Sequence, residues 1–103
     1  MERVISIKRL REFWQRHPDA ETPLRDWYRT ALKTPWRHLQ DVRIEYPHAD
    51  PVVVASGRTV TVFNICGNKY RLVVDILYRV HVIYVCTVLT HAEYSKQRWK
   101  DNL

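Results

Sequence analysis

The sequence predicts an α+β fold, in which N-terminal helices pack on a twisted antiparallel β-sheet of about four strands and a short C-terminal helix follows. In the first half of the chain, apolar residues recur at the three- and four-residue spacing of amphipathic helices. After Pro51 the chain changes to β-branched and aromatic runs separated by short turns, which is typical of antiparallel hairpins. With 103 residues, of which 46% are hydrophobic, we expect one domain with one modest core.

Two helices are expected first. One runs from Ser6, its N-cap, to Arg16 and ends before Pro18. The other starts at Thr22, a capping residue that is followed by Pro23 at the first helical position. The apolar side of this second helix consists of Leu24, Trp27, Tyr28, Ala31 and Leu32.

A weaker helical segment over Trp36–Glu45 precedes the predicted strands. The strands are expected at Val52–Val54, Thr59–Ile65, Lys69–Ile76 and Val80–Val88. In the third strand, alternation places one set of side chains on the core face, namely Tyr70, Leu72, Val74 and Ile76. The opposite face is expected to be open and charged, with Lys69, Arg71, Val73 and Asp75.

The final helix has an explicit start signal. Thr90 and Glu93 match the capping box, in which the two residues satisfy each other's backbone amides. Leu89 and Tyr94 fit the hydrophobic contact that often accompanies it. We expect one side of this helix to carry His91, Tyr94, Ser95 and Arg98.

The net charge is +6, and arginine outnumbers lysine. A basic surface is compatible with nucleic acid, an acidic protein or an anionic lipid, and does not choose among them. No apolar run is long enough for a membrane span and no signal peptide is recognisable, so we expect a cytoplasmic protein. Cys66 and Cys86 are interpreted as buried thiols, and no metal or other cofactor is expected.

The candidate chemistry is cleavage of an RNA phosphodiester, which needs a base, an acid and cations. Lys69 and Arg71, two residues apart on a strand, would lie about 6.6 Å apart and could hold a phosphate. The alternative is a solvated sheet face. His91 is expected at a helix N-terminus, where the helix dipole disfavours the imidazolium form, so its neutral ring can accept a proton. The alternative is a surface histidine that merely follows the helix cap. Tyr94 could stack on a base or donate a proton, although a packing role explains it equally well.

Several motifs occur together in a recognisable order: Arg3-Val4-Ile5-Ser6, Leu10-Arg11-Glu12-Phe13-Trp14, Thr61-Val62-Phe63-Asn64-Ile65, Gly67-Asn68-Lys69-Tyr70-Arg71-Leu72 and Leu89-Thr90-His91-Ala92-Glu93-Tyr94. From about residue 3 to residue 100, the chain resembles the HigB-type toxins of the RelE-like superfamily of type II toxin–antitoxin systems. The resemblance implies a RelE-like fold, with residues 1–103 forming one toxin domain.

The resemblance also implies a metal-independent endoribonuclease that cuts mRNA, commonly on the translating ribosome, and inhibits growth. The expected partner is a HigA-like helix-turn-helix antitoxin, and operator DNA would be bound only through the antitoxin complex. Carried over by position, the catalytic residues would be His91, Lys69, Arg71 and Tyr94. Asn68, Lys96 and Arg98 are expected to contact RNA.

Two positions depart from the family pattern. Relatives often carry a basic residue or a second glycine at position 66, and many carry arginine at position 86, where this chain has cysteines. Loss of a cation at Cys86 would weaken transition-state stabilisation unless Arg79, Lys96 or Arg98 compensates. A non-catalytic RNA- or ribosome-binding module with a decayed active site is therefore the alternative hypothesis, and a domain that recruits an acidic protein is the third.

Overall fold

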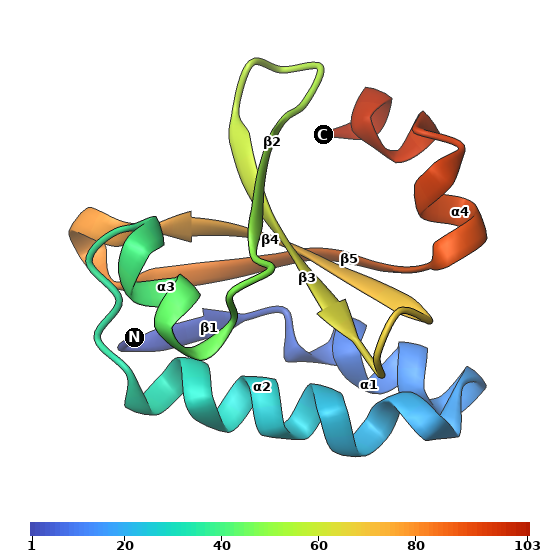
Figure 1. Ribbon diagram of the computed structural model, residues 1–103, viewed down its shortest axis with the longest axis horizontal. Coiled ribbons are helices and arrows are strands. Elements are labelled where there is room, and N and C mark those ends of the chain that lie inside the picture. The colour runs from blue at the N-terminus through green and yellow to red at the C-terminus, as the bar shows by residue number, and fades with distance from the viewer.

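A computed structural model describes residues 1–103 and shows one five-stranded sheet with helices around it (Figure 1). The strands, in their order across the sheet, are β1 (Arg3–Ile5), β5 (Val82–Thr90), β4 (Tyr70–Leu77), β3 (Thr59–Ile65) and β2 (Asp50–Val53). The four strands β2 to β5 are antiparallel and confirm the predicted meander. The edge strand β1 was not predicted; it pairs in parallel with β5. A strand of three residues is too short to show an alternating pattern of its own.

The α-helices are α1 (Ile7–Arg16), α2 (Glu21–Lys33), α3 (Leu39–Glu45) and α4 (His91–Ser95). Figure 1 shows α1 and α2 side by side across one face of the sheet, with α3 near β2. Short 3₁₀ turns lie at Pro18–Ala20 (η1), Tyr78–Val80 (η2) and Arg98–Asn102 (η3).

Ser6 occupies the predicted N-cap position of α1, but neither Ser6 nor Thr22 caps its helix through the side chain. Ser6 has a left-handed backbone, with φ 72°, and its side chain makes no capping hydrogen bond. The second helix begins at Glu21 rather than at Thr22, because η1 leads directly into it and Ala20 already has helical backbone angles. The capping box of α4 is confirmed: Glu93 N–H donates to Thr90 Oγ1 at 3.2 Å, and Thr90 N–H donates to a Glu93 carboxylate oxygen at 3.0 Å.

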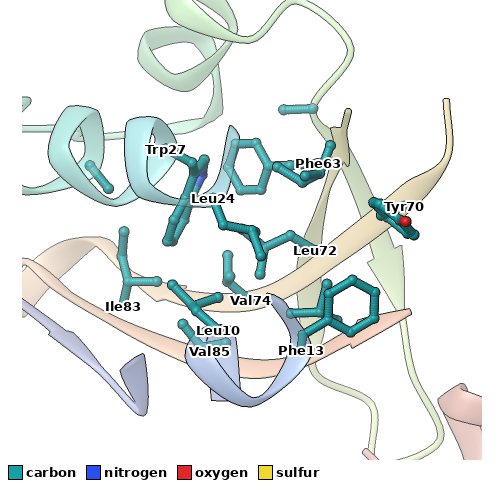
Figure 2. Packing of buried hydrophobic residues seen from close by; sticks show 14 of the residues in the cluster. Leu10, Phe13, Leu24, Trp27, Phe63, Tyr70, Leu72, Val74, Ile83 and Val85 are labelled. Carbon is teal, nitrogen blue, oxygen red and sulfur yellow. The ribbon is translucent and has the colours of Figure 1, made fainter. Parts of the chain in front are cut away.

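The main core lies between the sheet and the helices α1 and α2 (Figure 2). The predicted core face of β4 is confirmed, since Tyr70, Leu72, Val74 and Ile76 are all buried in this cluster. Trp27 of α2 is fully buried, and its ring lies 5.5 Å from that of Phe63 in an edge-to-face arrangement. Trp14 is also buried here, so both tryptophans of the first two helices pack in the core.

The opposite face of the sheet is less open than predicted. A second, smaller cluster covers part of it and consists of Val54, Val60, Val62, Val73, Cys86 and Trp99. Trp99 belongs to η3. It reaches this face because the chain after α4 turns back over the sheet (Figure 1). The sequence pattern did not predict that Val73 is buried. Val73 alternates with the charged residues Arg71 and Asp75, and nothing near it in the sequence shows that a distant segment covers it.

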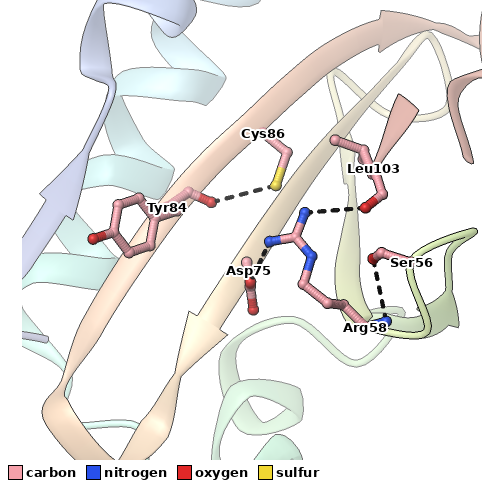
Figure 3. A network of polar contacts seen from close by, with 6 residues as sticks. All are labelled: Ser56, Arg58, Asp75, Tyr84, Cys86 and Leu103. Atoms are coloured by element: carbon pink, nitrogen blue, oxygen red, sulfur yellow. Dashed lines mark hydrogen bonds and ion pairs between the residues drawn. The ribbon is translucent and has the colours of Figure 1, made fainter. Parts of the chain in front are cut away.

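Arg58 fixes the end of the chain over this face (Figure 3). Its guanidinium donates to the Asp75 carboxylate at 2.9 Å and to the Leu103 carbonyl at 3.4 Å. In addition, the Ala55 amide donates to the Lys100 carbonyl at 3.1 Å. These bonds hold η3 above β4 and β5 and thereby shape the hollows described below.

Cys86 occupies a bulge in β5. Val73 pairs with Thr87 and Val74 pairs with Val85, so Cys86 has no partner on β4. Its carbonyl instead accepts a hydrogen bond from the guanidinium of Arg9 on α1. Bulges re-aim side chains near functional sites, and this one brings an α1 cation to the middle of β5.

Candidate functional site

The turn between β3 and β4 contains the motif residues Cys66 to Lys69. Cys66 and Gly67 both have positive φ, 54° and 64°, and the Lys69 amide donates to the Cys66 carbonyl at 3.2 Å. The Lys69 carbonyl in turn accepts from the His91 amide at 2.9 Å. The turn is thereby joined to the first residue of α4, which brings the two motifs of the sequence together.

Replacing Cys66 by glycine should stabilise the protein. A left-handed backbone costs a side-chain-bearing residue about 1–2 kcal/mol, and the extra freedom of glycine in the unfolded chain offsets part of the gain. We expect Cys66→Gly to raise the free energy of unfolding by about 0.5–1 kcal/mol in urea titrations. Gly67→Ala is the matched opposite case: an added Cβ meets no atom within 4 Å, yet φ is 64°, so it should destabilise through backbone strain alone. A lower unfolding free energy for Cys66→Gly would contradict this reading of the turn.

Arg71 is a nearly buried cation without an anionic partner. Only 8% of the residue is exposed. Its guanidinium donates to the Asn68 carbonyl at 3.2 Å, to the Tyr70 carbonyl at 3.1 Å and to the Asn68 side-chain oxygen at 2.6 Å. None of the five ion pairs in the structure includes Arg71. The guanidinium is therefore hydrogen-bonded to neutral oxygens alone, and its positive charge is available to an external anion.

Tyr94 lies against this cation. The Arg71 guanidinium carbon is 5.4 Å from the centroid of the Tyr94 ring, and the ring stacks on Trp99 at 5.3 Å. The Trp99 indole N–H also donates to the Tyr94 carbonyl at 3.2 Å. Burial raises the pKa of Tyr94, the nearby Asp50 carboxylate adds to this, and Arg71 opposes it. At neutral pH the phenol is thus a proton-bearing group placed beside Arg71.

Lys69 does not share the face of Arg71, so the predicted alternation is wrong at this residue. Lys69 lies in the turn, before β4 begins at Tyr70, and strand geometry does not apply to it. Its ammonium forms an ion pair with Asp19, whose carboxylate also accepts a hydrogen bond from the Tyr70 hydroxyl at 2.6 Å. The hydrogen bond and charge of Asp19 raise the pKa of Lys69, and the same contact lowers the pKa of Asp19. The Lys69 ammonium and the Arg71 guanidinium thus have separate partners in this structure.

His91 is exposed at the start of α4. This helix ends at Ser95, and a left-handed Gln97, with φ 65°, separates it from η3. A five-residue helix has a small macrodipole, so the electrostatic effect expected on the imidazole is weaker than the sequence pattern indicated. Arg98 belongs to η3 and does not continue the face of His91 and Tyr94 as predicted.

The larger of two hollows near these residues has a volume of about 510 Å³ and lies between η3, β5 and α1. Lys96 and Arg98 line it together with Arg9, and none of the three cations belongs to an ion pair. Cys86 also lines it, and burial raises the pKa of its thiol, which is therefore uncharged at neutral pH. Sequence reasoning missed Arg9, because only the fold brings α1 next to the bulge.

The second hollow has a volume of about 320 Å³ and contains Arg71 and Tyr94. The other polar side chains that line it are Arg43, His48, Asp50 and Asn64. No local signal identifies this set, since it combines α3, the segment after it and β2 with β3, β4 and α4. His91 and Lys69 line neither hollow.

A sequence model of the HigB toxin, described as the RelE-like toxic component of a toxin–antitoxin system, matches residues 20–97. The chain belongs to this family. The α+β architecture of this HigB-family chain is consistent with a RelE-like fold. The turn at 66–69, Arg71, His91, Tyr94 and Lys96 all lie inside the matched range, whereas Arg9 and Arg98 lie outside it. No curated protein matches the chain.

Both cysteines of this HigB-family chain are free, Cys86 buried and Cys66 partly buried. None of its helices combines the length and apolarity that crossing a bilayer requires.

Proposed function

We propose that this protein is the toxin of a type II toxin–antitoxin system and acts as an endoribonuclease that cleaves mRNA during translation, thereby inhibiting growth. The observation that carries the proposal is the Arg71 guanidinium, which is nearly buried, bonded only to neutral oxygens and placed at a hollow beside Tyr94. A phosphate is the natural fourth partner of such a group, because charge-assisted bonds from arginine to phosphate are strong and directional.

In this proposal Arg71 stabilises the charge that develops on the scissile phosphate, and Tyr94 orients the substrate. His91 takes the proton from the 2′-hydroxyl and returns one to the departing 5′-oxygen, which leaves a 2′,3′-cyclic phosphate and a 5′-hydroxyl. The exposed imidazole is free to do this, because the hydrogen bonds of His91 involve its backbone alone: its amide donates to the Lys69 carbonyl, and its carbonyl accepts from the Ser95 hydroxyl.

Lys69 is the second cation of the proposed site. Its ion pair with Asp19 is exposed, with 60% of the lysine and 41% of the aspartate side chain accessible. Exposed pairs contribute little to stability, so the phosphate of a bound RNA can compete with Asp19 for the ammonium. The flexible lysine stem allows this exchange without movement of the turn.

Asn68, Lys96 and Arg98 are proposed to contact flanking RNA. Asn68 is already fixed against Arg71. Lys96 and Arg98 lie with Arg9 in the larger hollow, where these three unpaired cations outnumber the one acidic side chain, Glu93, and form a surface suited to a phosphate backbone. We add Arg9 to the predicted set on this ground.

The proposed activity places the protein in the cytoplasm, with mRNA on the ribosome as substrate. A HigA-like helix-turn-helix antitoxin would be the neutralising partner, and operator DNA would be contacted only by the complex. A basic toxin with exposed, unpaired cations suits a partner or substrate of opposite charge.

The test is induced expression in bacteria of the wild type, His91→Ala and the double variant Lys69→Ala/Arg71→Ala. The wild type should arrest growth and fragment transcripts, and both variants should lose these effects. His38→Ala and Arg25→Ala/Lys33→Ala are the matched controls, since these residues are exposed and lie on α2 or at the start of α3. Intact transcripts and normal growth with the wild type would refute the nuclease.

The second candidate function is a non-catalytic RNA- or ribosome-binding module. It is favoured by Cys86, a buried neutral thiol at a position where the resemblance implies arginine in many relatives. RNA affinity that falls steeply with salt, without any cleaved product, would support this candidate.

A further inference from the structure

The smaller hollow beside Arg71 contains more recognition chemistry than phosphate binding requires. Its volume of about 320 Å³ is at the lower end of the range of small-molecule pockets, about 300–1,000 Å³, and so suits a single nucleotide. A carboxylate, a second guanidinium and a carboxamide line it, from Asp50, Arg43 and Asn64. None of these three residues is used by the proposed reaction.

The strand register fixes two of these groups on one face of the sheet. Asp50 on β2 pairs with Val62 on β3, and Asn64 lies two residues further along β3, opposite Arg71 on β4. Residues in such a diagonal relation are about 7–8 Å apart, which is within reach of one nucleobase. The strand pairing thus places the carboxylate and the carboxamide on the same face as Arg71.

Arg43 completes the set from α3. Its Nε donates to the Ala49 carbonyl at 3.0 Å, which holds the guanidinium close to the segment that enters β2. Its terminal nitrogens make no hydrogen bond within the protein, and neither do the side chains of Asp50 and Asn64. Arg43 and Asp50 do not form an ion pair with each other or with any other residue. Both charges are therefore available to a ligand.

We propose that this hollow is a guanine-nucleotide subsite, in which Asp50 and Arg43 read the base of the nucleotide whose phosphate is held by Arg71. This inference rests on the proposed function in one respect, that the ligand is part of an RNA chain. The recognition of guanine is argued independently, from the groups that line the hollow.

Guanine is the base that matches these groups. Its N1–H and N2–H are adjacent donors suited to one carboxylate, and its O6 and N7 are adjacent acceptors suited to a guanidinium. Adenine offers a single exocyclic amine next to an acceptor. Uracil flanks its only donor with two carbonyls, and cytosine has one donor group beside an acceptor. A hollow with an unpaired aspartate and an unpaired arginine therefore discriminates in favour of guanine.

The binding test titrates the purified protein with guanosine, adenosine, cytidine and uridine 5′-monophosphates and follows amide shifts by NMR. We expect guanosine monophosphate to bind about tenfold more tightly than the other three, with shifts at Asp50 and Asn64. Asp50→Asn should abolish the preference while leaving the amide spectrum otherwise native, and Asn64→Ala should reduce it. Asp26→Asn is the matched control, because Asp26 is an exposed aspartate on α2.

Equal affinity for the four nucleotides, or a guanine preference that persists in Asp50→Asn, would overturn the subsite. Cleavage of a mixed-sequence RNA separates this inference from the proposed function. Wild-type protein that cuts with guanine enriched at one position next to the break, and Asp50→Asn that cuts without this enrichment, would support both. Selective binding of guanosine monophosphate without cleavage would support the subsite and refute the nuclease. Cleavage without base preference would support the nuclease and refute the subsite.

Discussion

Replacing Arg71 by alanine is expected to lower the rate of RNA cleavage by about 100- to 1,000-fold, the usual loss when one preorganised donor to a developing charge is removed. The guanidinium donates three hydrogen bonds to neutral oxygens before substrate arrives, so no reorganisation is needed to receive the phosphate. The measurement is single-turnover cleavage of an end-labelled RNA.

Two further variants show whether this loss reflects charge, geometry or folding. Arg71→Lys keeps the charge but not the planar fork, and should recover only part of the rate. Arg25→Ala removes an exposed arginine from α2 and should leave cleavage unchanged. The unfolding transition of each variant is recorded in parallel. If natively folded Arg71→Ala cleaved within about threefold of the wild-type rate, Arg71 would not be the phosphate ligand.

Replacing Phe63 by alanine is expected to have the largest effect on stability. Phe63 is fully buried at the centre of the main core, and its ring packs against those of Trp27, Trp36 and Tyr46 at 5.5, 6.2 and 5.2 Å. Truncation of such a ring leaves a cavity and costs about 3–5 kcal/mol. We expect the free energy of unfolding to fall by this amount in urea titrations followed by circular dichroism.

The matched control for Phe63 is Val53→Ala, since Val53 is 64% exposed on the edge strand β2 and should change the unfolding free energy by less than about 0.5 kcal/mol. A loss below about 1 kcal/mol for Phe63→Ala would mean that the aromatic cluster is not the centre of the core.

The fold was largely predictable because each half of the chain has its own hydrophobic period. The helical spacing around Trp27 and the alternation through Leu72 both correspond to buried faces of the structure. The capping box at Thr90 was also predictable, since it depends only on residues close in sequence. Strand β1 was not, because its three residues are stabilised by pairing with β5, nearly 80 positions away.

The candidate site was predictable only in part. The motifs singled out Arg71 and Tyr94, and the structure places the Arg71 guanidinium beside the Tyr94 ring. Alternation misplaced Lys69, because β4 begins at Tyr70, one residue later than the pattern indicated, and Lys69 still belongs to the turn. Arg9, Arg43 and Asp50 could not be found from spacing, since the bulge at Cys86 and the order of the strands bring them to the site.

The account depends most on whether this basic surface cuts RNA. The most direct measurement is the mapping of transcript ends in a reconstituted translation reaction that receives purified wild-type protein or Arg71→Ala. We predict breaks that carry a 2′,3′-cyclic phosphate or 3′-phosphate on one side and a 5′-hydroxyl on the other, with the wild type alone. Transcripts that remain intact with the wild type, or that are cut equally by both proteins, would contradict the proposed nuclease site.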